Sequence, residues 1–314
     1  MDKSASARGP AIVLINGKSG TVRSMGAETV HALIGNALQE WPAGSEVHVI
    51  DGSEFGQAVS RIIAEGKFKT LIAGGGDGTI ASIAGQILGS DIALGILPLG
   101  TMNLVAKSLG IDGRIAEAFA QLRTADHRQI DAGRADGNIF LHTLSFGIQP
   151  RMVKIREKLG YHSRLSKMLA GGRAMLSVLL KPQSMRLRAS IDGRTIDLKA
   201  PAVVISNNVC DNSMWLHAGR LDGGQLGFYA VQPMSTLSFL GLALDLLRGR
   251  WRENLNVREE QGRRMQIEKR HRFGGKSRKI VATLDGEIML LSSPVEIRIE
   301  PLSLEVLVPR QTEA

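Results

Sequence analysis

Apolar and polar positions alternate in a regular way along the first part of the chain. Short apolar runs occupy residues 11–15, 47–50, 70–73 and 92–97, and segments of helical composition occupy residues 25–39, 55–65 and 80–88. Strand-like runs that alternate with helices predict βαβ units, which build a parallel sheet covered by helices on both faces. We therefore expect an α/β fold at this end of the chain.

The pattern changes after about residue 125, where strand-like segments follow one another directly. Turn signals such as Ala135-Asp136-Gly137 and Asp192-Gly193-Arg194 join them, and Asp-Gly pairs are typical of hairpins. The strand-like segments are residues 129–134, 138–146, 186–191, 195–199, 203–206 and 295–308. We expect an α/β domain with a parallel sheet over residues 1–127 and a mainly antiparallel β domain over residues 128–299. A strand at about residues 300–310 is a candidate to return to the first domain.

Composition narrows the class of protein. Hydrophobic residues make up 43% and charged residues 22% of the chain, which is ordinary for a globular protein. The single cysteine, Cys210, excludes an internal disulfide framework and fits a reducing cytoplasm. The start of the chain lacks a signal-peptide core, and the most apolar helical stretch, residues 237–247, is too short to span a bilayer. We expect a soluble cytoplasmic protein.

The net charge of +9 and the isoelectric point near 9.9 call for a polyanionic partner. Nucleic acid is disfavoured, because aromatic residues make up only 4% of the chain and no zinc-finger or RNA-recognition signature is present. Residues 151–181 interleave basic and apolar side chains, a pattern that suits an anionic membrane surface. A solvated helix face explains that segment equally well. We expect a peripheral association with membranes, and a homodimer remains open.

One stretch carries the strongest chemical signal. The apolar run at residues 70–73 leads into Gly74-Gly75-Gly76-Asp77-Gly78-Thr79, and a helical segment follows. A glycine-rich turn between a strand and a helix lets main-chain N–H groups approach phosphates closely. A carboxylate beside phosphates requires a divalent cation between them, so Asp77 indicates phosphoryl transfer. The alternative is a strand-to-helix turn in which Asp77 is only the N-cap.

Two more polar loops follow apolar strands at the same edge of the expected sheet. Residues 16–20, Asn16-Gly17-Lys18-Ser19-Gly20, follow the first strand, and residues 98–104, which include Gly100, Thr101 and Asn103, follow the fourth. Open α/β sheets bind ligands at the carboxyl ends of their strands, so the three loops are expected to converge there. Lys18 is a candidate to meet a phosphate. Thr101 is also expected to serve as a helix N-cap.

These motifs resemble the nucleotide-binding signature of the diacylglycerol kinase catalytic-domain family, which is related to sphingosine kinases and NAD kinases. The loop at residues 16–20 is similar to the family's Asn-Pro-x-Ser-Gly element with Gly17 in place of proline, and Leu104 replaces an Asp that is common in the family. The resemblance implies ATP as phosphoryl donor with Mg²⁺, which Asp77 would position with the γ-phosphate. It implies that the following residues hold or shape the nucleotide site: Asn16, Lys18, Ser19, Gly20, Gly74, Gly75, Gly76, Gly78, Thr79, Gly100, Thr101 and Asn103.

Two later elements are compared with the same family. Asp285-Gly286-Glu287 is similar to its Asp-Gly-Glu element, in which an acidic residue accepts the proton of the lipid hydroxyl; Glu287 or Asp285 would do so here. A plain β-turn is the alternative for this tripeptide. Asp222 resembles one ligand of a structural magnesium site, but Gly227 replaces the second Asp. A single carboxylate is a thin ligand set for Mg²⁺, so a turn is favoured there.

The resemblance implies an ATP-dependent lipid kinase that phosphorylates diacylglycerol or a similar lipid. An NAD kinase-like enzyme is one alternative, since NAD kinases share the Gly-Gly-Asp-Gly-Thr loop. A non-catalytic lipid-binding regulator on the same fold is the other, because two family acids are absent at Leu104 and Gly227.

Overall fold

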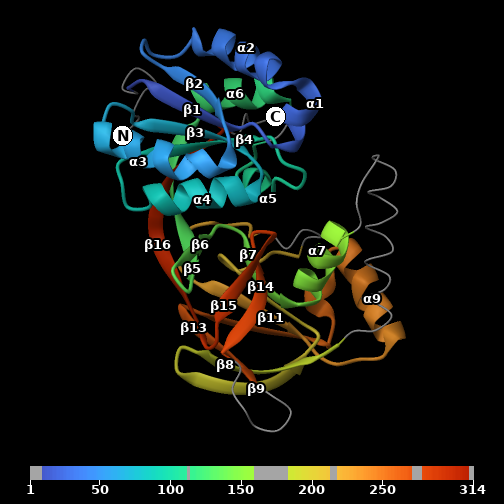
Figure 1. The fold of residues 1–314 in the computed structure, drawn as a ribbon. Coiled ribbons are helices and arrows are strands. Elements are labelled where there is room, and N and C mark those ends of the chain that lie inside the picture. The colour runs from blue at the N-terminus through green and yellow to red at the C-terminus, as the bar shows by residue number, and fades with distance from the viewer. Residues whose placement is uncertain (1–8, 112–113, 159–182, 213–217, 271–277, 311–314) are drawn as a thin grey trace. The chain divides into compact units, whose positions relative to one another are not determined.

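The structure is a computed structural model that describes residues 9–111, 114–158, 183–212, 218–270 and 278–310. The chain divides into two compact units, one of residues 1–132 with 301–314 and the other of residues 133–300. Two strands, β5 (Asp126–Ala135) and β16 (Val295–Val308), carry the chain across the boundary (Figure 1). The boundary expected at residue 127 therefore lies inside β5, and the return expected at about residue 300 lies inside β16.

The first unit is built on a parallel sheet with the strand order β2-β1-β3-β4-β16. The strands that begin here are β1 (Ala11–Asn16), β2 (Glu46–Ile50), β3 (Thr70–Gly75) and β4 (Ala93–Pro98). Helices α2 (Ala27–Leu38) and α6 (Ile115–Arg123) lie on one side of this sheet, and α3 (Phe55–Glu65) and α4 (Asp77–Ile87) on the other (Figure 1). The expected α/β fold with a parallel sheet is confirmed.

Local sequence explains why these elements form. Every residue of β3 is buried, as expected for a central parallel strand covered on both faces. In α3 the buried residues Phe55, Val59 and Ile62 recur at helical spacing, so one stripe of the helix faces the core. The helix ends at Gly66, whose φ of 62° is left-handed and typical of a helix C-terminus.

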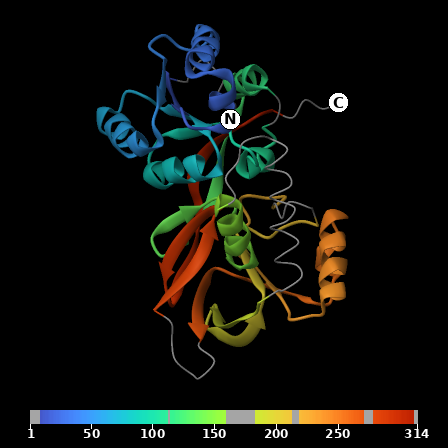
Figure 2. The same ribbon diagram turned by 45° about the vertical axis from the view of Figure 1, so that its right-hand side comes forward.

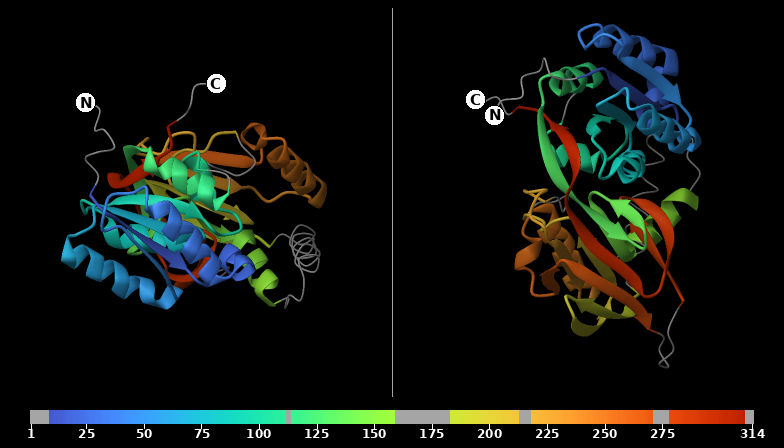
Figure 3. Two further views of the ribbon diagram at one scale, coloured as in Figure 1. Left: turned by 90° about the horizontal axis from the view of Figure 1, so that it is seen from above. Right: turned by 90° about the vertical axis from the view of Figure 1, so that its left-hand side faces the viewer.

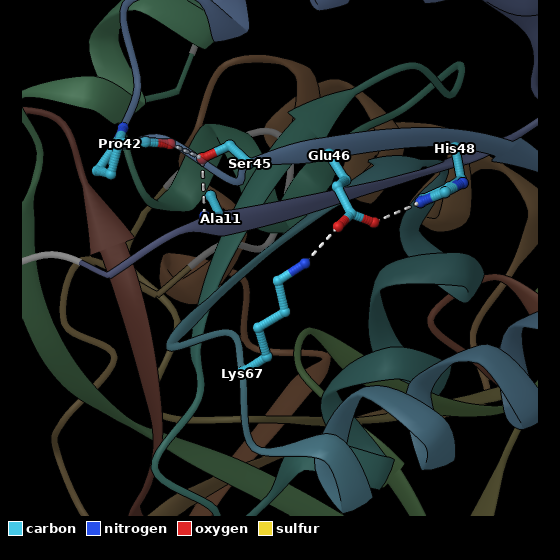
Figure 4. Close-up of polar contacts among 6 residues, drawn as sticks. All are labelled: Ala11, Pro42, Ser45, Glu46, His48 and Lys67. Atoms are coloured by element: carbon cyan, nitrogen blue, oxygen red, sulfur yellow. Dashed lines mark hydrogen bonds and ion pairs between the residues drawn. The ribbon is translucent and has the colours of Figure 1, made fainter.

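Strand β2 forms the edge of this sheet, and polar contacts fix its beginning (Figure 4). The hydroxyl of Ser45 accepts a hydrogen bond from the Ala11 N–H at 3.0 Å and donates one to the Pro42 carbonyl at 2.7 Å. The carboxylate of Glu46 accepts from the Lys67 ammonium at 2.5 Å and contacts the imidazole of His48 at 3.3 Å. Charged side chains on an edge strand discourage pairing with other chains. These contacts lie at the beginning of the strands, so the carboxyl ends remain for other roles.

The second unit is mainly antiparallel β structure, as expected (Figures 1, 2 and 3). One sheet has the order β12-β11-β10-β7-β14-β15, and another set of strands has the order β16-β13-β8-β9. The strands of this unit, besides β5 and β16, are β6 (Asn138–Phe140), β7 (Thr143–Gly147), β8 (Met185–Ile191), β9 (Arg194–Ala200), β10 (Ala202–Ser206), β11 (Leu226–Val231), β12 (Val257–Gly262), β13 (Arg264–Arg270), β14 (Lys279–Leu284) and β15 (Glu287–Ser292). Their inward side chains, among them Phe146, Phe228 and Ile267, form one buried core.

Within the described residues of this unit, the α-helices are α7 (Ile148–Lys158) and α9 (Thr236–Leu247). The expected basic segment at residues 151–181 therefore begins in α7, and its remainder from residue 159 lies outside the described residues. Around α9 and the short helix η3 (Trp251–Glu253), a small second core includes Cys210, Tyr229, Leu242 and Trp251. None of the helices in the described residues has the length and apolar content needed to cross a membrane.

Three Asp-Gly pairs make the hairpin turns of the second unit in the same way. The φ angles of Asp136, Asp192 and Asp285 are 47°, 45° and 46°, and those of the glycines that follow them are 87°, 85° and 88°. Two successive residues with positive φ define the turn that matches the twist of a two-residue hairpin, and glycine enters it without a steric cost. The two hairpins expected at Asp136 and Asp192 are thus confirmed, and Asp285 belongs to a third.

The helix expected over residues 25–39 is confirmed as α2, and a short helix, α1 (Gly20–Met25), precedes it; Gly26, with φ of 91°, separates the two. The strand expected over residues 138–146 was wrong in its extent, because it is two strands, β6 and β7. The break falls at residues 141 and 142, where main-chain N–H groups donate to the carboxylate of Asp285 and not to a neighbouring strand.

Candidate functional site

Three loops at the carboxyl ends of β1, β3 and β4 meet in the first unit. The N–H of Leu99 donates to the carbonyl of Gly75 at 3.0 Å, and a Cβ on Gly100 would lie only 2.5 Å from the Cα of Gly76. The two glycine-containing loops therefore touch through their main chains, which only glycine permits at that distance. The structure brings these loops together at one edge of the sheet, as the strand pattern led us to expect.

The loop after β1 joins the same edge through Asn16. Its amide nitrogen donates to the Thr79 hydroxyl at 3.0 Å, and its amide oxygen accepts the N–H of Lys18 at 2.9 Å. The hydroxyl oxygen of Ser19 is buried and has no hydrogen-bond partner among the described residues. A buried polar atom without a partner in the protein is costly, so a ligand that reaches this hydroxyl would gain from it. Gly20, the next residue, is exposed.

Lys18 is less available to a ligand than the sequence indicates. Its ammonium forms an ion pair with the carboxylate of Asp51 at 2.7 Å, and 73% of its side chain is exposed. The Lys18 ammonium and two hydrogen bonds from Ser53 lower the pKa of Asp51 to about 2. Sequence reasoning missed Asp51, although it follows β2 at the carboxyl edge of the sheet, where polar residues belong to the site.

The two glycines at the end of β3 are also confined. A Cβ on Gly74 would lie 2.9 Å from the side chain of Leu99, and one on Gly75 would lie 2.7 Å from that of Thr79. Gly78 and Thr79 belong to the first turn of α4, and Gly76 is its N-cap. The expectation that Asp77 could be the N-cap of α4 is therefore wrong, because Asp77 is the first residue inside the helix.

The Asp77 side chain stabilises the beginning of another helix, not of α4, to which Asp77 belongs. Its carboxylate accepts the N–H of Val105 at 3.1 Å and also interacts with the N–H groups of Asn103 and Leu104. These N–H groups lie at the beginning of α5 (Leu104–Ser108), so Asp77 caps the loop that follows β4. Burial raises the pKa of this carboxyl above its ordinary value, and the hydrogen bonds from the main chain oppose that rise. Position 104, where the family often has Asp, contributes its main-chain N–H to this contact.

Asn103, and not Thr101, begins helix α5. Asn103 is the N-cap and has a left-handed backbone with φ of 51°. Its side chain accepts the Gly100 N–H at 2.9 Å and donates to the Gly100 carbonyl at 3.1 Å. The prediction that Thr101 is the N-cap is therefore wrong, because α5 begins only after Asn103. The Thr101 side chain is exposed.

This arrangement suits a chain of phosphates. The first N–H groups of an α-helix have no partner within the helix, and the helix dipole favours negative charge at that end. Helix α4 presents such an end directly after three glycines, in contact with the Gly100 loop, and its Thr79 is hydrogen-bonded to Asn16 of the loop that contains Ser19. Magnesium bound to phosphates commonly takes only one or two protein carboxylates, so Asp77 alone fits that role.

In the second unit, the Asp-Gly-Glu element is the turn between β14 and β15. Both oxygens of Asp285 are used, because they accept the N–H groups of Leu141 at 2.7 Å, His142 at 2.9 Å and Thr143 at 2.8 Å. Asp285 is 9% exposed. Glu287, the first residue of β15, is exposed and its carboxylate has no partner among the described residues. Of the two acids left open by the sequence, Glu287 is therefore the one free to accept a proton.

Asp222 does not assemble a metal site with other described residues. Its carboxylate accepts a hydrogen bond from Arg220 at 3.1 Å and is exposed. The described part of the chain holds no group of three His, Cys, Asp or Glu side chains that could bind a metal ion together. The turn interpretation of this segment therefore remains the better one.

Comparison with known proteins agrees with these features. The model of the diacylglycerol kinase catalytic domain matches residues 10–135, and the model of the YegS C-terminal NAD kinase beta sandwich-like domain matches residues 144–308. A solved structure of a diacylglycerol kinase from Bacillus anthracis str. Sterne superposes with a TM-score of 0.65, at 16% identity, over 97% of this chain and 98% of that chain. The fold is thus that of the diacylglycerol kinase-like proteins.

Sequence relatives lead to the same group. A "Probable lipid kinase YegS-like" of Klebsiella pneumoniae (strain 342) is 33% identical over 169 residues, which cover 52% of this chain and 55% of that protein. The "Diacylglycerol kinase" of Bacillus subtilis (strain 168) is 23% identical over 70% of this chain and 72% of that protein. The chain spans about half the length of the first curated relatives that it matches, between 51% and 55%. The chain belongs to the family defined by the YegS C-terminal domain, whose model matches more than half of it, and its residues 10–135 match the diacylglycerol kinase catalytic domain.

Proposed function

We propose that this protein is an ATP-dependent lipid kinase that phosphorylates the free hydroxyl of diacylglycerol or a similar lipid. The observation that carries this proposal is the main-chain contact between the Gly76 and Gly100 loops at the beginning of α4. It supplies the N–H-lined edge that a triphosphate requires, in a chain of this family. The product would be a lipid of the phosphatidic acid type.

In this proposal the first unit holds the donor. The N–H groups at the beginning of α4, the Asn16–Gly20 loop and the Gly100 loop bind the phosphates of ATP. Mg²⁺ would be held by Asp77 together with the phosphates, and it would neutralise charge on the transferred group. Asp77 has a second role, because it fixes the first turn of α5 through the Val105 N–H.

In the proposed chemical step, Glu287 of the second unit accepts the proton of the lipid hydroxyl. The lipid hydroxyl oxygen forms a bond to the γ-phosphorus, the bond from that phosphorus to the bridging oxygen breaks, and ADP leaves. The hydroxyl proton moves to the exposed carboxylate of Glu287. Asp285 is a positioning residue in this scheme, since its carboxylate is committed to three main-chain N–H groups.

Helix α9 supports a peripheral membrane location for the second unit. Its exposed leucines are Leu237 at 80%, Leu240 at 43%, Leu244 at 45% and Leu247 at 65%, and they recur at helical spacing. Arg248 and Arg250 follow at the end of the helix. An apolar stripe flanked by cations suits the interface of an anionic membrane.

Flotation with anionic vesicles tests this location. Binding should weaken in Leu237→Ser/Leu247→Ser, whereas an unchanged flotation accompanied by loss of a dimer would assign the stripe to a second copy of the chain.

One assay tests the enzyme proposal against its alternatives. Purified protein is incubated with Mg²⁺ and γ-labelled ATP, and diacylglycerol, a long-chain base and NAD are offered separately. Label in phosphatidic acid is the expected result. Label in NADP would select an NAD kinase-like enzyme, and lipid binding without label in any acceptor would select a non-catalytic regulator.

A further inference from the structure

A second set of basic residues lies in the second unit, on elements other than the phosphate loops. A pocket of about 560 Å³ is lined by Arg151, Ser184, Met185, Arg186, Lys199, Lys269 and Arg270. Five of these seven described residues carry a positive charge, and none of the seven carries a negative one. We propose that this pocket binds a phosphomonoester dianion. This inference does not depend on the proposed kinase activity.

The register of the strands places three of the cations in one row. Arg186 in β8 lies directly opposite Arg270 in β13 on one side and opposite Lys199 in β9 on the other. Directly opposite residues project from the same face of a sheet. Leu187 and Ala189, next to them in β8, are buried in the core, so this row lies on the outer face. Like charges directly opposite one another destabilise a sheet unless an anion lies among them.

The neighbouring row shows how the same strands balance charge elsewhere. Two residues further along, Arg188 lies between Glu268 and Asp197, in an alternating arrangement of charge. The Arg188 guanidinium donates to both oxygens of Asp197 at 2.8 and 2.9 Å. The pKa of Asp197 is lowered by this pair. The row that contains Arg186 therefore lacks this alternation of charge, because no acidic residue of β9 lies opposite Arg186.

Carboxylates do not compensate most of the charge in the pocket. Arg270 donates to Glu268 at 3.1 Å, and Arg151 donates to the neutral side chain of Gln183 at 2.5 Å. Arg186 and Lys199 are exposed and form no ion pair with any residue that the structure describes. The sequences of residues 159–182 and 271–277, which flank the pocket residues in the chain, contain neither Asp nor Glu. The positive charge is thus left for an external anion.

The side chains specify the kind of anion. Guanidinium groups bind phosphate through paired hydrogen bonds, and a lysine ammonium adds a compact charge. Several uncompensated cations favour an anion with two charges on one group, which a phosphomonoester supplies at neutral pH. Nucleic acid is disfavoured, because none of the described residues that line the pocket is aromatic and could stack on a base. The anion is either a free phosphate compound or a phosphomonoester headgroup at a membrane.

Two double variants distinguish binding at this site from a general electrostatic attraction of anions to the basic protein. Arg186→Gln/Lys199→Gln removes two unpaired cations of the row. Arg263→Gln/Arg264→Gln removes the same charge from exposed positions at the opposite end of β13, and it serves as the control. In isothermal titration calorimetry with inorganic phosphate, the first pair should lose affinity about tenfold or more, because charge-assisted hydrogen bonds to the anion are lost. The control should bind phosphate like the wild-type protein.

Thermal unfolding supplies an independent readout. Without phosphate, Arg186→Gln/Lys199→Gln should unfold at a higher temperature than wild type, since repulsion between neighbouring cations is relieved. Added phosphate should raise the unfolding temperature of the wild-type protein and of the control, and it should raise that of the first pair less. A phosphate bound only at the loops of the first unit would stabilise all three proteins equally, and that result would overturn the proposal.

Vesicles distinguish the two sources of the phosphate group. Phosphatidylcholine vesicles containing phosphatidic acid are compared with vesicles containing phosphatidylglycerol, whose phosphodiester carries one charge. If a headgroup is the ligand, wild type should prefer the phosphatidic acid vesicles and Arg186→Gln/Lys199→Gln should lose that preference. If a free compound is the ligand, calorimetry should show saturable phosphate binding without a vesicle preference. Absence of both effects, or a wild-type preference for an oligonucleotide over phosphate, would contradict the inference.

Discussion

The carboxylate of Asp77 accepts the main-chain N–H of Val105 at 3.1 Å. This contact joins the loop after β3 to the helix after β4, so the residue expected to handle the nucleotide also fixes the loop beside it. Burial raises the pKa of the same carboxyl. A group whose pKa is raised on folding stabilises the fold while it is protonated and loses that contribution as the pH rises through its folded-state pKa. Burial therefore opposes the ionisation of Asp77 in the folded protein.

Asp77→Asn tests whether that charge serves catalysis. An amide oxygen can still accept the Val105 N–H, so the fold should persist, whereas kinase activity should fall by about 10²-fold or more if the negative charge positions Mg²⁺. The free energy of unfolding of Asp77→Asn relative to wild type should increase as the pH rises above the ordinary pKa of the carboxyl, since only wild type has a carboxyl whose ionisation is opposed by burial. Chemical denaturation at several pH values measures this difference. Unchanged activity would reduce Asp77 to a structural role.

Asp77→Ala provides the matched comparison, because it removes both the charge and the acceptor. It should destabilise the first unit by about 1–2 kcal/mol, the usual cost of a lost helix cap. If Asp77→Ala and Asp77→Asn unfold alike, the hydrogen bond to Val105 contributes nothing measurable.

Gly100→Ala tests the contact between the two glycine loops. The added Cβ would lie 2.5 Å from the Cα of Gly76 and 2.8 Å from the amide oxygen of Asn103, so one loop must move. We expect the KM for ATP to rise about tenfold or more, because misplaced N–H groups no longer fit the phosphates. Gly56→Ala is the control, since its Cβ meets nothing within 4 Å and it lies in helix α3. That change should stabilise the protein by about 0.5–1 kcal/mol and leave KM unchanged. An equal KM in both variants would show that the contact is not needed.

Glu287→Gln and Asp285→Asn should separate chemistry from structure. Glu287 is exposed, so Glu287→Gln should keep the unfolding temperature and lower kcat about 10²-fold or more if it accepts the proton. Asp285→Asn replaces one acceptor oxygen by an NH₂ group that faces a main-chain donor, and it should destabilise the second unit by about 2–3 kcal/mol. Activity assays and thermal unfolding of the purified variants provide both measurements. Glu253→Gln, another exposed acid without a partner among the described residues, is the control for a change of charge.

Local signals explain why much of the fold could be predicted from sequence. The hairpins at Asp136 and Asp192 follow from neighbouring residues alone, since an Asp-Gly pair supplies two positive φ angles. The contact from Asp77 to Val105 depends instead on the adjacency of β3 and β4 and on the exact path of two loops. The prediction of Thr101 as an N-cap was wrong for this reason, because the left-handed backbone of Asn103 sets the beginning of α5. Likewise, only burial distinguishes Asp285 from Glu287, and a tripeptide motif does not encode burial.

The buried thiol of Cys210 gives a probe of the second unit. Burial raises the pKa of this thiol to about 11, so almost none is thiolate at pH 7, and the side chain is fully buried. A thiol reagent such as dithiobisnitrobenzoate should label the native protein very slowly and the guanidinium-unfolded protein at once. Because Cys210 is the only cysteine, Cys210→Ser gives the background. Tyr229→Phe should accelerate native labelling, since it removes the hydrogen bond that the Cys210 N–H donates to the Tyr229 hydroxyl at 2.8 Å and so weakens the packing around the thiol. Native labelling as fast as that of the unfolded chain would contradict the packing of Cys210 against Tyr229 and Trp251.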